Sequence, residues 1–208
     1  MHIREFIEKN YPEYYSIERY PKDRSAPFCS VDQPWGILSN FGRTPLVVDG
    51  VRFDCTEKLF QVMKFADPVS RKAIWSVNGQ TIKMKAKHFE KAGTVRPDWG
   101  EIIVDAMKFC LMEKFRQSEA FREELERSRG LYIVEDQTTF PKKSPDTWGV
   151  KLCADGSEFV GPNLMGRLLM ELRDNGKLDY TLPEDVLLFQ DLATALDHLG
   201  YGIAVERR

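Results

Sequence analysis

The spacing of apolar and polar residues changes several times along the chain, and each change predicts a different element. Two short apolar runs between residues 45 and 53 flank Asp49-Gly50, a strong two-residue signal for a β-hairpin. Between residues 99 and 115, apolar residues recur at every third or fourth position, which is the spacing of one buried helix face. Similar patterns predict four further helices: Thr56 to about 66, Thr81 to Lys91, Ser118 to 129, and Asn163 to Arg173.

Residues with capping preferences set the expected ends of these helices. Thr56, Ser118 and Asn163 are suited to the N-cap role, and Asp98 with Glu101 forms the D-x-x-E pattern of a capping box. Pro68 prevents a simple continuation of the helix that begins at Thr56. Glycines follow three of the predicted helices, at Gly93, Gly130 and Gly176.

The remaining segments are shorter or less regular. The first forty residues are rich in Pro, Tyr and Ser and predict a short helix, extended segments and turns. Leu131 to Glu135 reads as a short apolar strand, and one more helix is expected from Pro183 to Gly200, after a polar linker. The chain is therefore predicted to be α+β, a mainly helical single domain with short β elements.

Composition and charge exclude several classes of protein. The 208 residues include 30 basic and 32 acidic ones, a formal net charge of −2, which argues against binding to nucleic acid mainly through phosphate neutralisation. Two local basic stretches remain, Lys83-Lys85-Lys87-Lys91 and Lys142-Lys143, and each is more simply read as a solvated face. No stretch approaches the roughly 18 apolar residues of a membrane span, so no membrane contact is expected.

The cysteines and histidines give no metal-site pattern. The four cysteines are far apart, no C-x-x-C occurs, and the three histidines share no ligand spacing, so a zinc site is not expected. The N-terminus has no apolar signal core. We therefore expect reduced thiols in a soluble cytoplasmic protein that needs no metal or other cofactor.

One predicted helix carries a polar pattern of chemical interest. Glu57, Gln61 and Lys64 are spaced i, i+4, i+7 and are expected on one face, so a carboxylate, an amide and an amine point the same way. By spacing alone, an exposed polar face with a weak ion pair is the commoner explanation. Catalysis needs such groups held together on a rigid support, which the apolar residues of this helix would provide.

Two tryptophans and one glycine-rich segment are weaker candidates. Trp99 begins a helix, and Trp148 lies in a polar loop just after Asp146, where a large ring can stack on a base. Ordinary core filling explains both tryptophans equally well. The segment from Gly161 to Gly166 opens a helix whose free N–H groups can bind an anion, although a plain helix start is the simpler interpretation.

In their order and spacing, these segments resemble the NADAR family of YbiA-like N-glycosidases. Thr56 to Phe65 resembles the family's E-x-x-F-Q-x-x-K helix, and Gly161 to Arg173 its G-x-N-x-L-G helix, with Met165 where leucine is usual. The other matching segments lie in order between residues 38 and 149: Leu38-Ser39-Asn40-Phe41, Val48-Asp49-Gly50, Arg96-Pro97-Asp98-Trp99, Lys114-Phe115, Leu131 to Glu135, and Asp146-Thr147-Trp148-Gly149.

The resemblance implies three parts. Residues 1–27 are an N-terminal extension, residues 28–176 a YbiA-like catalytic domain, and residues 177–208 a C-terminal helical extension packed on the domain. Three departures affect the choice of substrate. His88-Phe89 stands where the family often has glycine and arginine, the loop between Glu135 and Asp146 is longer than expected, and the segment after Gly176 has no recognised counterpart. Lys85 or Lys87 would replace the missing arginine.

The resemblance also implies an activity, the hydrolysis of the bond between ribose C1 and an exocyclic aromatic amine. The expected reaction removes ADP-ribose from guanine, so the partners would be an ADP-ribose-type nucleotide and ADP-ribosylated DNA or RNA. One alternative is clearance of ribosylated intermediates of riboflavin synthesis. Another is a non-catalytic module that binds ADP-ribose. The presence of both Glu57 and Lys64 argues against the module, because simple binding does not need that pair.

Two mechanisms follow from this implied chemistry. In one, Lys64 attacks C1 of the ring-opened sugar and forms a Schiff base, while Glu57 transfers protons. In the other, Glu57 stabilises an oxocarbenium-like transition state and activates water, Lys64 only orients it, and Asp146 is the second carboxylate. By resemblance, six residues would bind substrate: Asn40, Gln61, Trp99, Glu135, Trp148 and Asn163.

Overall fold

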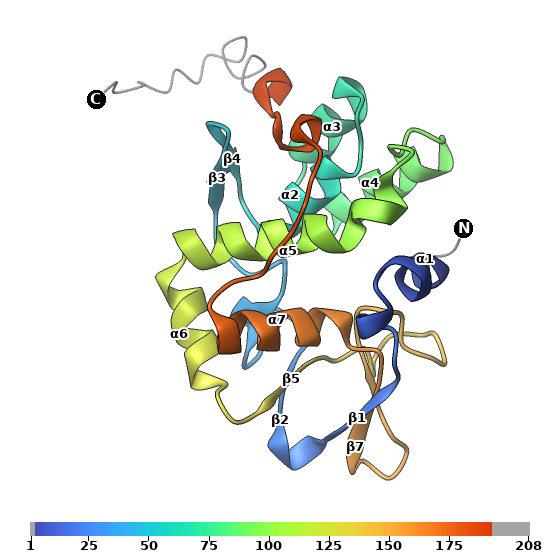
Figure 1. Cartoon of the computed structure of the whole chain (residues 1–208), viewed down its shortest axis with the longest axis vertical. Coiled ribbons are helices and arrows are strands. Elements are labelled where there is room, and N and C mark those ends of the chain that lie inside the picture. Colours follow the sequence, from blue (N-terminus) through green and yellow to red (C-terminus); the bar gives the residue numbers. More distant parts are fainter. Residues whose placement is uncertain (1–2, 193–208) are drawn as a thin grey trace.

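The computed structural model of the chain describes residues 3–192. Figure 1 shows the long helix α5 (Trp99–Gln117) crossing the middle of the molecule. On one side of it lie α2 (Thr56–Met63), α3 (Pro68–Trp75) and α4 (Thr81–Lys91); on the other lie α7 (Leu164–Asn175) and most of the strands. Helix α6 (Glu119–Arg127) closes one end, and α1 (Ile3–Asn10) packs on α5 near the other.

The strands are short and form three separate sheets. In the first, β1 (Glu18–Pro21), β7 (Glu158–Gly161) and β6 (Lys151–Leu152) pair antiparallel in that order. In the second, β2 (Ser25–Phe28) pairs parallel with β5 (Tyr132–Glu135), so that Phe28 stands opposite Glu135. The third is the hairpin of β3 (Leu46–Val48) and β4 (Val51–Phe53). The prediction of a mainly helical α+β single domain is confirmed.

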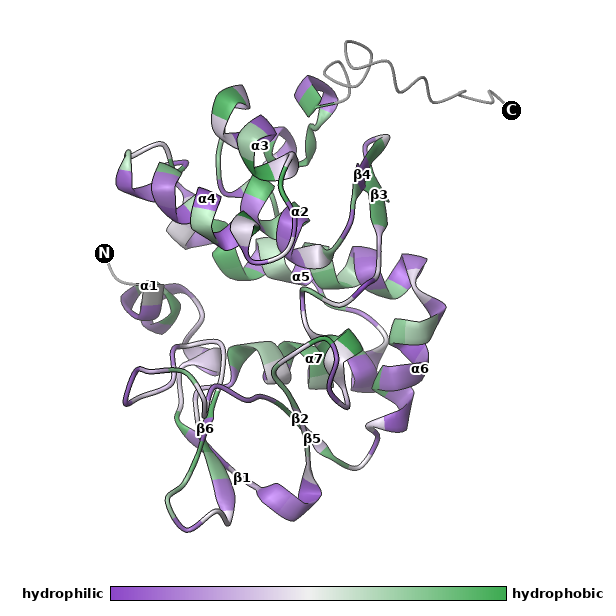
Figure 2. Cartoon of the chain, turned by 180° about the vertical axis from the view of Figure 1, so that it is seen from behind, coloured by the Kyte–Doolittle hydropathy of each residue, from purple (hydrophilic) through white to green (hydrophobic). Residues whose placement is uncertain are grey.

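The core is built around α5, which is apolar on nearly all sides. Val104, Phe109 and Cys110 are all buried although they point in different directions around this helix. Helix α7 buries Leu168, Leu169 and Leu172 against the other side of the core. Figure 2 shows the contrast with α4 and α6, whose residues are mostly hydrophilic. Within residues 3–192, no helix is both long and apolar enough to cross a bilayer.

Several local predictions are confirmed because their signals need no distant partner. Asp49 and Gly50 take φ values of 50° and 74°, as a tight hairpin turn requires. The side chain of Ser118 accepts a hydrogen bond from the Phe121 N–H and caps α6. Helix α4 has the expected bounds, and α7 ends at Gly176, which has a φ of 70°.

Other local predictions are wrong, at one capping residue and at the ends of two helices. The Asp98 carboxylate makes no capping box; it binds the Arg96 guanidinium, with N···O distances of 2.6 and 2.9 Å. Cys55, not Thr56, is the N-cap residue of α2, which ends at Met63 rather than near residue 66. Pro68 begins a helix that the sequence analysis missed, α3, with the Asp67 side chain accepting from the Ser70 N–H at 2.8 Å.

The expected last helix, from Pro183 to Gly200, lies partly outside the described residues. Within them, this stretch begins with the short 3-10 helix η4 (Glu184–Leu187). Phe189 then packs on the β3–β4 hairpin, with its ring 5.1 Å from that of Phe53 and the Arg71 guanidinium 5.0 Å from its ring. The described part of the C-terminal segment is thus docked on the helical side of the molecule.

Candidate active site

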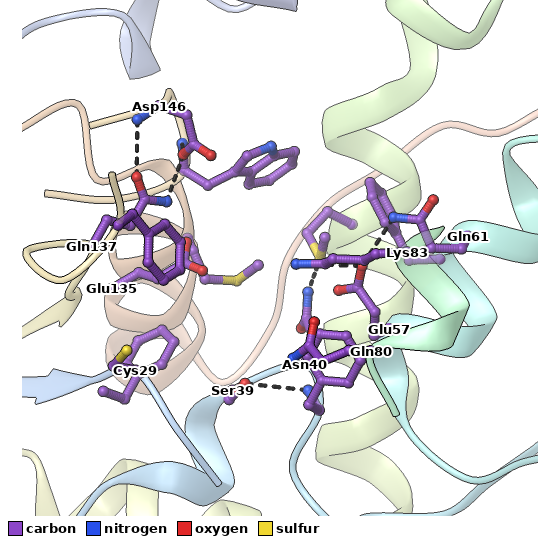
Figure 3. Close-up of a pocket in the computed structure, with 17 residues that line it drawn as sticks. Cys29, Ser39, Asn40, Glu57, Gln61, Gln80, Lys83, Glu135, Gln137 and Asp146 are labelled. Carbon is purple, nitrogen blue, oxygen red and sulfur yellow. Dashed lines mark hydrogen bonds and ion pairs between the residues drawn. The ribbon is translucent and has the colours of Figure 1, made fainter. Parts of the chain in front are cut away.

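A cavity of about 380 Å³ opens between two walls that come from distant parts of the chain. One wall, the helical wall, carries Glu57 and Gln61 from α2, Lys83 from α4, and Asn40 from the turn before β3, as Figure 3 shows. The facing wall consists of the end of β5 and the loop after it. The remaining lining residues complete the cavity: Phe28, Cys29, Ser39, Phe41, Phe60, Gln80, Met107, Glu135, Gln137, Phe140, Asp146, Trp148 and Met165.

Glu57 is the central group of the helical wall. It sits in the first turn of α2 and is only 4% exposed. Its Oε1 accepts a hydrogen bond from Gln61 Nε2 at 2.9 Å and lies 3.7 Å from Lys83 Nζ. Because an amide donor and an ammonium both face this oxygen, the site is suited to a negatively charged carboxylate.

Lys83 reaches the cavity from the first turn of α4. Its side chain is 53% exposed, and its Nζ lies 5.1 Å from the centre of the Phe41 ring. The amine therefore stands at the mouth of the cavity, beside Glu57 and open to solvent. Lys85 and Lys87, the expected substitutes for the family's arginine, are exposed and do not line this cavity.

Two amide side chains in this wall present unpaired acceptors. Asn40 donates from Nδ2 to Met107 Sδ at 3.4 Å, while its buried Oδ1 has no partner within the described structure. Gln61 donates to Glu57, and its buried Oε1 also has no partner there. Buried polar atoms are nearly always hydrogen-bonded. These two oxygens are therefore suited to accept hydrogen bonds from hydroxyl or amino groups of a ligand.

Glu135 gives the facing wall a different character. It is the last residue of β5, and its Oε2 is buried with no partner among the described residues. Burial raises the pKa of the Glu135 carboxyl to about 8, and the negative charges of Asp146 and Glu57 act in the same direction, against a smaller effect of Lys83. At neutral pH this carboxyl is therefore mostly protonated and can donate a proton into the cavity.

Asp146 lies at the rim of the same wall and is held by two hydrogen bonds to Gln137. Gln137 Nε2 donates to Asp146 Oδ1 at 2.6 Å, and the Asp146 N–H donates to Gln137 Oε1 at 2.9 Å. The same Oδ1 accepts from the Trp148 N–H at 2.9 Å. These bonds fix the loop that carries Trp148, whose ring meets that of Phe60 at 5.9 Å and lines the cavity.

Asn163 does not line the cavity, although it was predicted to bind substrate. It is fully buried; its Oδ1 accepts from the Glu135 N–H at 3.1 Å and its Nδ2 donates to the Ile133 carbonyl at 2.9 Å. At the start of α7, the structure agrees with the simpler interpretation of a plain helix start rather than an anion site. The N–H groups of Leu164 and Met165 donate to the carbonyls of Thr147 and Trp148, at 3.1 and 3.0 Å.

Lys64 and Trp99 lie outside this cavity as well. Both line a second cavity of about 370 Å³, where Lys64 Nζ pairs with the Glu90 carboxylate. A spacing of seven residues advances about 10.5 Å along a helix axis, so Lys64 shares the face of Glu57 but emerges at the other end of α2. The Trp99 ring packs behind Phe60, 5.1 Å from it. Glu57 and Lys64, predicted to act together, thus line two different cavities in the structure.

The sequence analysis missed Lys83 and Gln137 as members of the site. Gln137 follows Glu135 by two positions, the spacing of one strand face, and this signal was available. Lys83 belongs to a basic stretch that was read as a solvated face, and nothing in its spacing separates it from its neighbours. Among residues 3–192, no three His, Cys, Asp or Glu side chains gather in a way that would hold a metal ion.

In Glu135 and Glu57, a protonated carboxyl group faces a carboxylate across a cavity. Hydrolases that cleave glycosidic bonds use such a pair. Comparison with known proteins agrees. The NADAR domain matches residues 27–175, most of the chain, and the chain belongs to this family.

Two of three similar proteins are named N-glycosidases, and the third is named for riboflavin biosynthesis. The chain is 28% identical to N-glycosidase YbiA of Escherichia coli over 158 residues, which span 76% of this chain and 92% of that protein. It is 24% identical to an N-glycosidase of Nostoc punctiforme over 149 residues, 71% of this chain and 89% of that one. A riboflavin biosynthesis protein of Vibrio vulnificus is 24% identical over 185 residues, 88% of this chain and 47% of that one.

A solved structure has the same fold. The NMR structure of E. coli YbiA superimposes with a TM-score of 0.57 at 25% identity, covering 88% of this chain and 92% of that one. The chain is thus a NADAR-family enzyme, a hydrolase that acts on N-glycosyl compounds.

Proposed function

We propose that this enzyme hydrolyses the bond between ribose C1 and an exocyclic aromatic amine, and that its substrate is ADP-ribose attached to guanine. The observation that carries the proposal is the difference between the two facing carboxyl groups. Glu135 is mostly protonated at neutral pH, whereas Glu57 is held by hydrogen-bond and ion-pair donors. One supplies the proton that the leaving amine needs, and the other stabilises positive charge at C1.

The proton balance of the reaction follows from these two groups. As the C1–N bond breaks, the Glu135 carboxyl gives its proton to the leaving nitrogen, and the bonding electrons go to that nitrogen. Water then adds to C1 and loses a proton to Glu57. Asn40 Oδ1 and Gln61 Oε1 would accept hydrogen bonds from sugar hydroxyls or base amino groups, and the Trp148 ring would pack against the base.

A Schiff-base route uses the same cavity with Lys83 in place of Lys64. Such a glycosylamine can open its sugar ring and expose an imine-like C1. The Lys83 ammonium would first pass a proton to Glu57, and the neutral Nζ would then add to this carbon. The aromatic amine would leave with a proton from Glu135, and water would release the sugar from the lysine. Lys83 is the candidate because it lines the cavity 3.7 Å from Glu57. Borohydride trapping of a lysine–sugar adduct tests this route.

The size of the cavity supports a substrate that extends beyond it. About 380 Å³ encloses a base with one ribose, so further groups would lie across the mouth. The exposed Lys83 stands there, and the loop between Gln137 and Asp146, which lines the cavity through Phe140, carries the exposed Lys142 and Lys143. These cations favour the diphosphate of ADP-ribose, or the backbone of an ADP-ribosylated nucleic acid.

A second candidate substrate is a ribosylated intermediate of riboflavin synthesis. It contains the same bond and needs fewer groups outside the cavity, and a relative in Vibrio vulnificus is named a riboflavin biosynthesis protein. The two candidates share the inner cavity and differ at its mouth. Their discrimination therefore depends on the groups that lie outside the reacting bond.

The test is turnover of a short oligonucleotide bearing ADP-ribose on guanine, measured beside the riboflavin-pathway ribosylamine. We expect release of ADP-ribose, with a kcat/KM at least tenfold higher than for the small substrate and falling as salt rises. Turnover of the small ribosylamine alone would transfer the enzyme to metabolite clearance. Tight binding of ADP-ribose with no turnover of either compound would contradict the proposal and indicate a binding module.

A further inference from the structure

Lys114 is a fully buried lysine that neither cavity wall contains. It lies near the end of α5 and is 0% exposed, yet no carboxylate pairs with it among the described residues. Its Nζ donates instead to the Ile37 carbonyl at 2.6 Å and to the Ser39 carbonyl at 2.8 Å, and it stands 4.4 Å from the centre of the Phe121 ring. Burying an ammonium group without a carboxylate partner costs desolvation free energy, which its hydrogen bonds must offset.

The two carbonyls converge because the chain curls around them. The Gly42 N–H donates to the Ser39 carbonyl at 2.9 Å, and a Cβ on Gly42 would come within 2.7 Å of the Ile37 oxygen and 2.9 Å of the Ser39 oxygen. Carbonyl dipoles that point at one another repel, so a donor between them is needed to keep this curl. The amine keeps two N–H groups even when neutral, so both carbonyls retain a donor, although burial lowers the pKa of Lys114 to about 7.

The same segment is strained at its start. Trp35 has a φ of 66°, a left-handed conformation that is rare for a bulky residue and costs on the order of 1–2 kcal/mol. Its ring is covered by the Arg127 guanidinium at 4.0 Å. Strain of this kind persists only where the surroundings impose it. The segment from Trp35 to Gly42 is therefore shaped from outside, by α6 at one end and by Lys114 in the middle.

This segment carries groups of the active site. Asn40 and Phe41 line the cavity, and the Phe41 N–H donates to Ser39 Oγ at 3.2 Å. The Asn40 carbonyl accepts from the Glu57 N–H at 2.8 Å, which connects the segment to the start of α2. A shift of the Ser39 carbonyl would thus move both the Asn40 acceptor and the first turn that holds Glu57.

We propose that Lys114 is a positioning residue of the active site, which holds the carbonyls of Ile37 and Ser39 together so that Asn40 and Glu57 keep their places in the cavity. Lys114 touches no substrate, and its effect reaches the reaction through the segment from Trp35 to Gly42. The kinetic part of this inference rests on the proposed glycosidase activity. The structural part does not, because the order of the segment can be measured without a substrate.

The first experiment compares two variants that should disturb the segment from opposite sides. Lys114→Met keeps the length of the side chain and removes the donors, whereas Gly42→Ala keeps Lys114 and pushes its two acceptor carbonyls. In hydrogen exchange, we expect both variants to lose protection in peptides covering residues 33–42, with no change over residues 151–161. In turnover, we expect kcat/KM to fall at least tenfold, with KM raised as well as kcat lowered.

Ile7→Ala is the matched control for a loss of stability alone. Ile7 is fully buried in α1, away from the cavity, and its truncation should cost about 2–4 kcal/mol of unfolding free energy. At a temperature where all variants are folded, this control should keep the parental kcat and KM. If Lys114→Met does not fold, Gly42→Ala alone still tests the curl.

The outcomes separate this proposal from the proposed function. Parental exchange and parental kinetics in both variants would overturn the positioning role, as would equal kinetic losses in Ile7→Ala. Suppose that the two variants lose protection over residues 33–42, but that the parent protein turns over neither the ADP-ribosylated oligonucleotide nor the riboflavin-pathway ribosylamine. That result would uphold the structural part of the inference and refute the proposed activity.

Discussion

The two walls of the cavity hold the same kind of residue in opposite conditions. On the helical wall, Glu57 is 4% exposed but receives a hydrogen bond from Gln61 and faces the Lys83 amine at 3.7 Å. On the facing wall, Glu135 has a buried oxygen with no donor. Burial, together with the nearby Asp146 charge, raises the pKa of its carboxyl to about 8. The difference teaches that burial makes a carboxyl an acid where no donor faces it, as at Glu135, and that neighbouring donors distinguish Glu57 from it.

The largest effect is expected for Glu57→Gln, which removes the negative charge of the Glu57 side chain and keeps its shape. Loss of charge stabilisation at C1 should lower kcat by about 10³-fold. Single-turnover measurements at saturating substrate would show it. The control is Glu90→Gln, which breaks the ion pair with Lys64 outside the cavity and should leave kcat within about twofold. A Glu57→Gln enzyme with parental kcat would remove the distinction between the walls.

The next effect comes from a matched pair of lysines, Lys83→Met and Lys64→Met. Lys83 lines the cavity and Lys64 does not, so we expect a loss of about 10²-fold in kcat/KM for the first and less than threefold for the second. Borohydride trapping during turnover sharpens the result: an adduct that disappears only in Lys83→Met would establish the Schiff-base route. The reverse pattern would return the catalytic role to Lys64.

A smaller effect, with a clear pH signature, is expected for Glu135→Gln. In the parent enzyme, Glu135 loses its proton as the pH rises through about 8, so the rate should fall above that pH. The variant should be about 10- to 100-fold slower at pH 7 and should lack this fall. A pH–rate profile from 5.5 to 9.5 measures both, and an unchanged profile would refute the acid role.

The same substitution should change stability in a direction that the pKa fixes. Between the ordinary value of 4.5 and about 8, the folded protein holds a proton that the unfolded chain has lost. The free energy of unfolding must therefore decrease as the pH rises through this window. In Glu135→Gln, the free energy of unfolding should depend less on pH. At pH 8.5 the variant should be more stable than the parent by on the order of 3 kcal/mol, as urea denaturation at pH 5 and 8.5 would show.

The sequence was most informative where a signal acts within a few residues. The Asp49-Gly50 turn, the Ser118 cap and the Gly176 stop needed no distant partner, and the helix with Glu57 and Gln61 was found from its own spacing. The strand β6 was missed because it has only two residues, and β7 was missed because it pairs along its length with the distant β1. The family resemblance identified Asn40, Glu135, Asp146 and Trp148 as site residues, and all four line the cavity.

The failures have one physical cause: a side chain's partner is set by the tertiary structure. Lys64 lies on the same face of α2 as Glu57 but at the other end of the helix, where it pairs with the Glu90 carboxylate. Asn163 has the right residue type to contact a sugar, but both its amide atoms are used by the backbone of β5. Lys83, by contrast, reaches the site through the way α4 packs on α2, which no spacing in the sequence encodes.

The bonds of Asn163 also have a consequence for the order in which the enzyme becomes active. This single amide ties the end of β5 to the start of α7, and β5 in turn pairs with β2, more than a hundred residues earlier in the chain. Such distant contacts form late in folding, whereas α2 to α6 are linked by local ones. The Asn163 bonds to β5 can form only when α7 docks, so we expect the Glu135 acid to take its place at that step and a molecule without a docked α7 to be inactive.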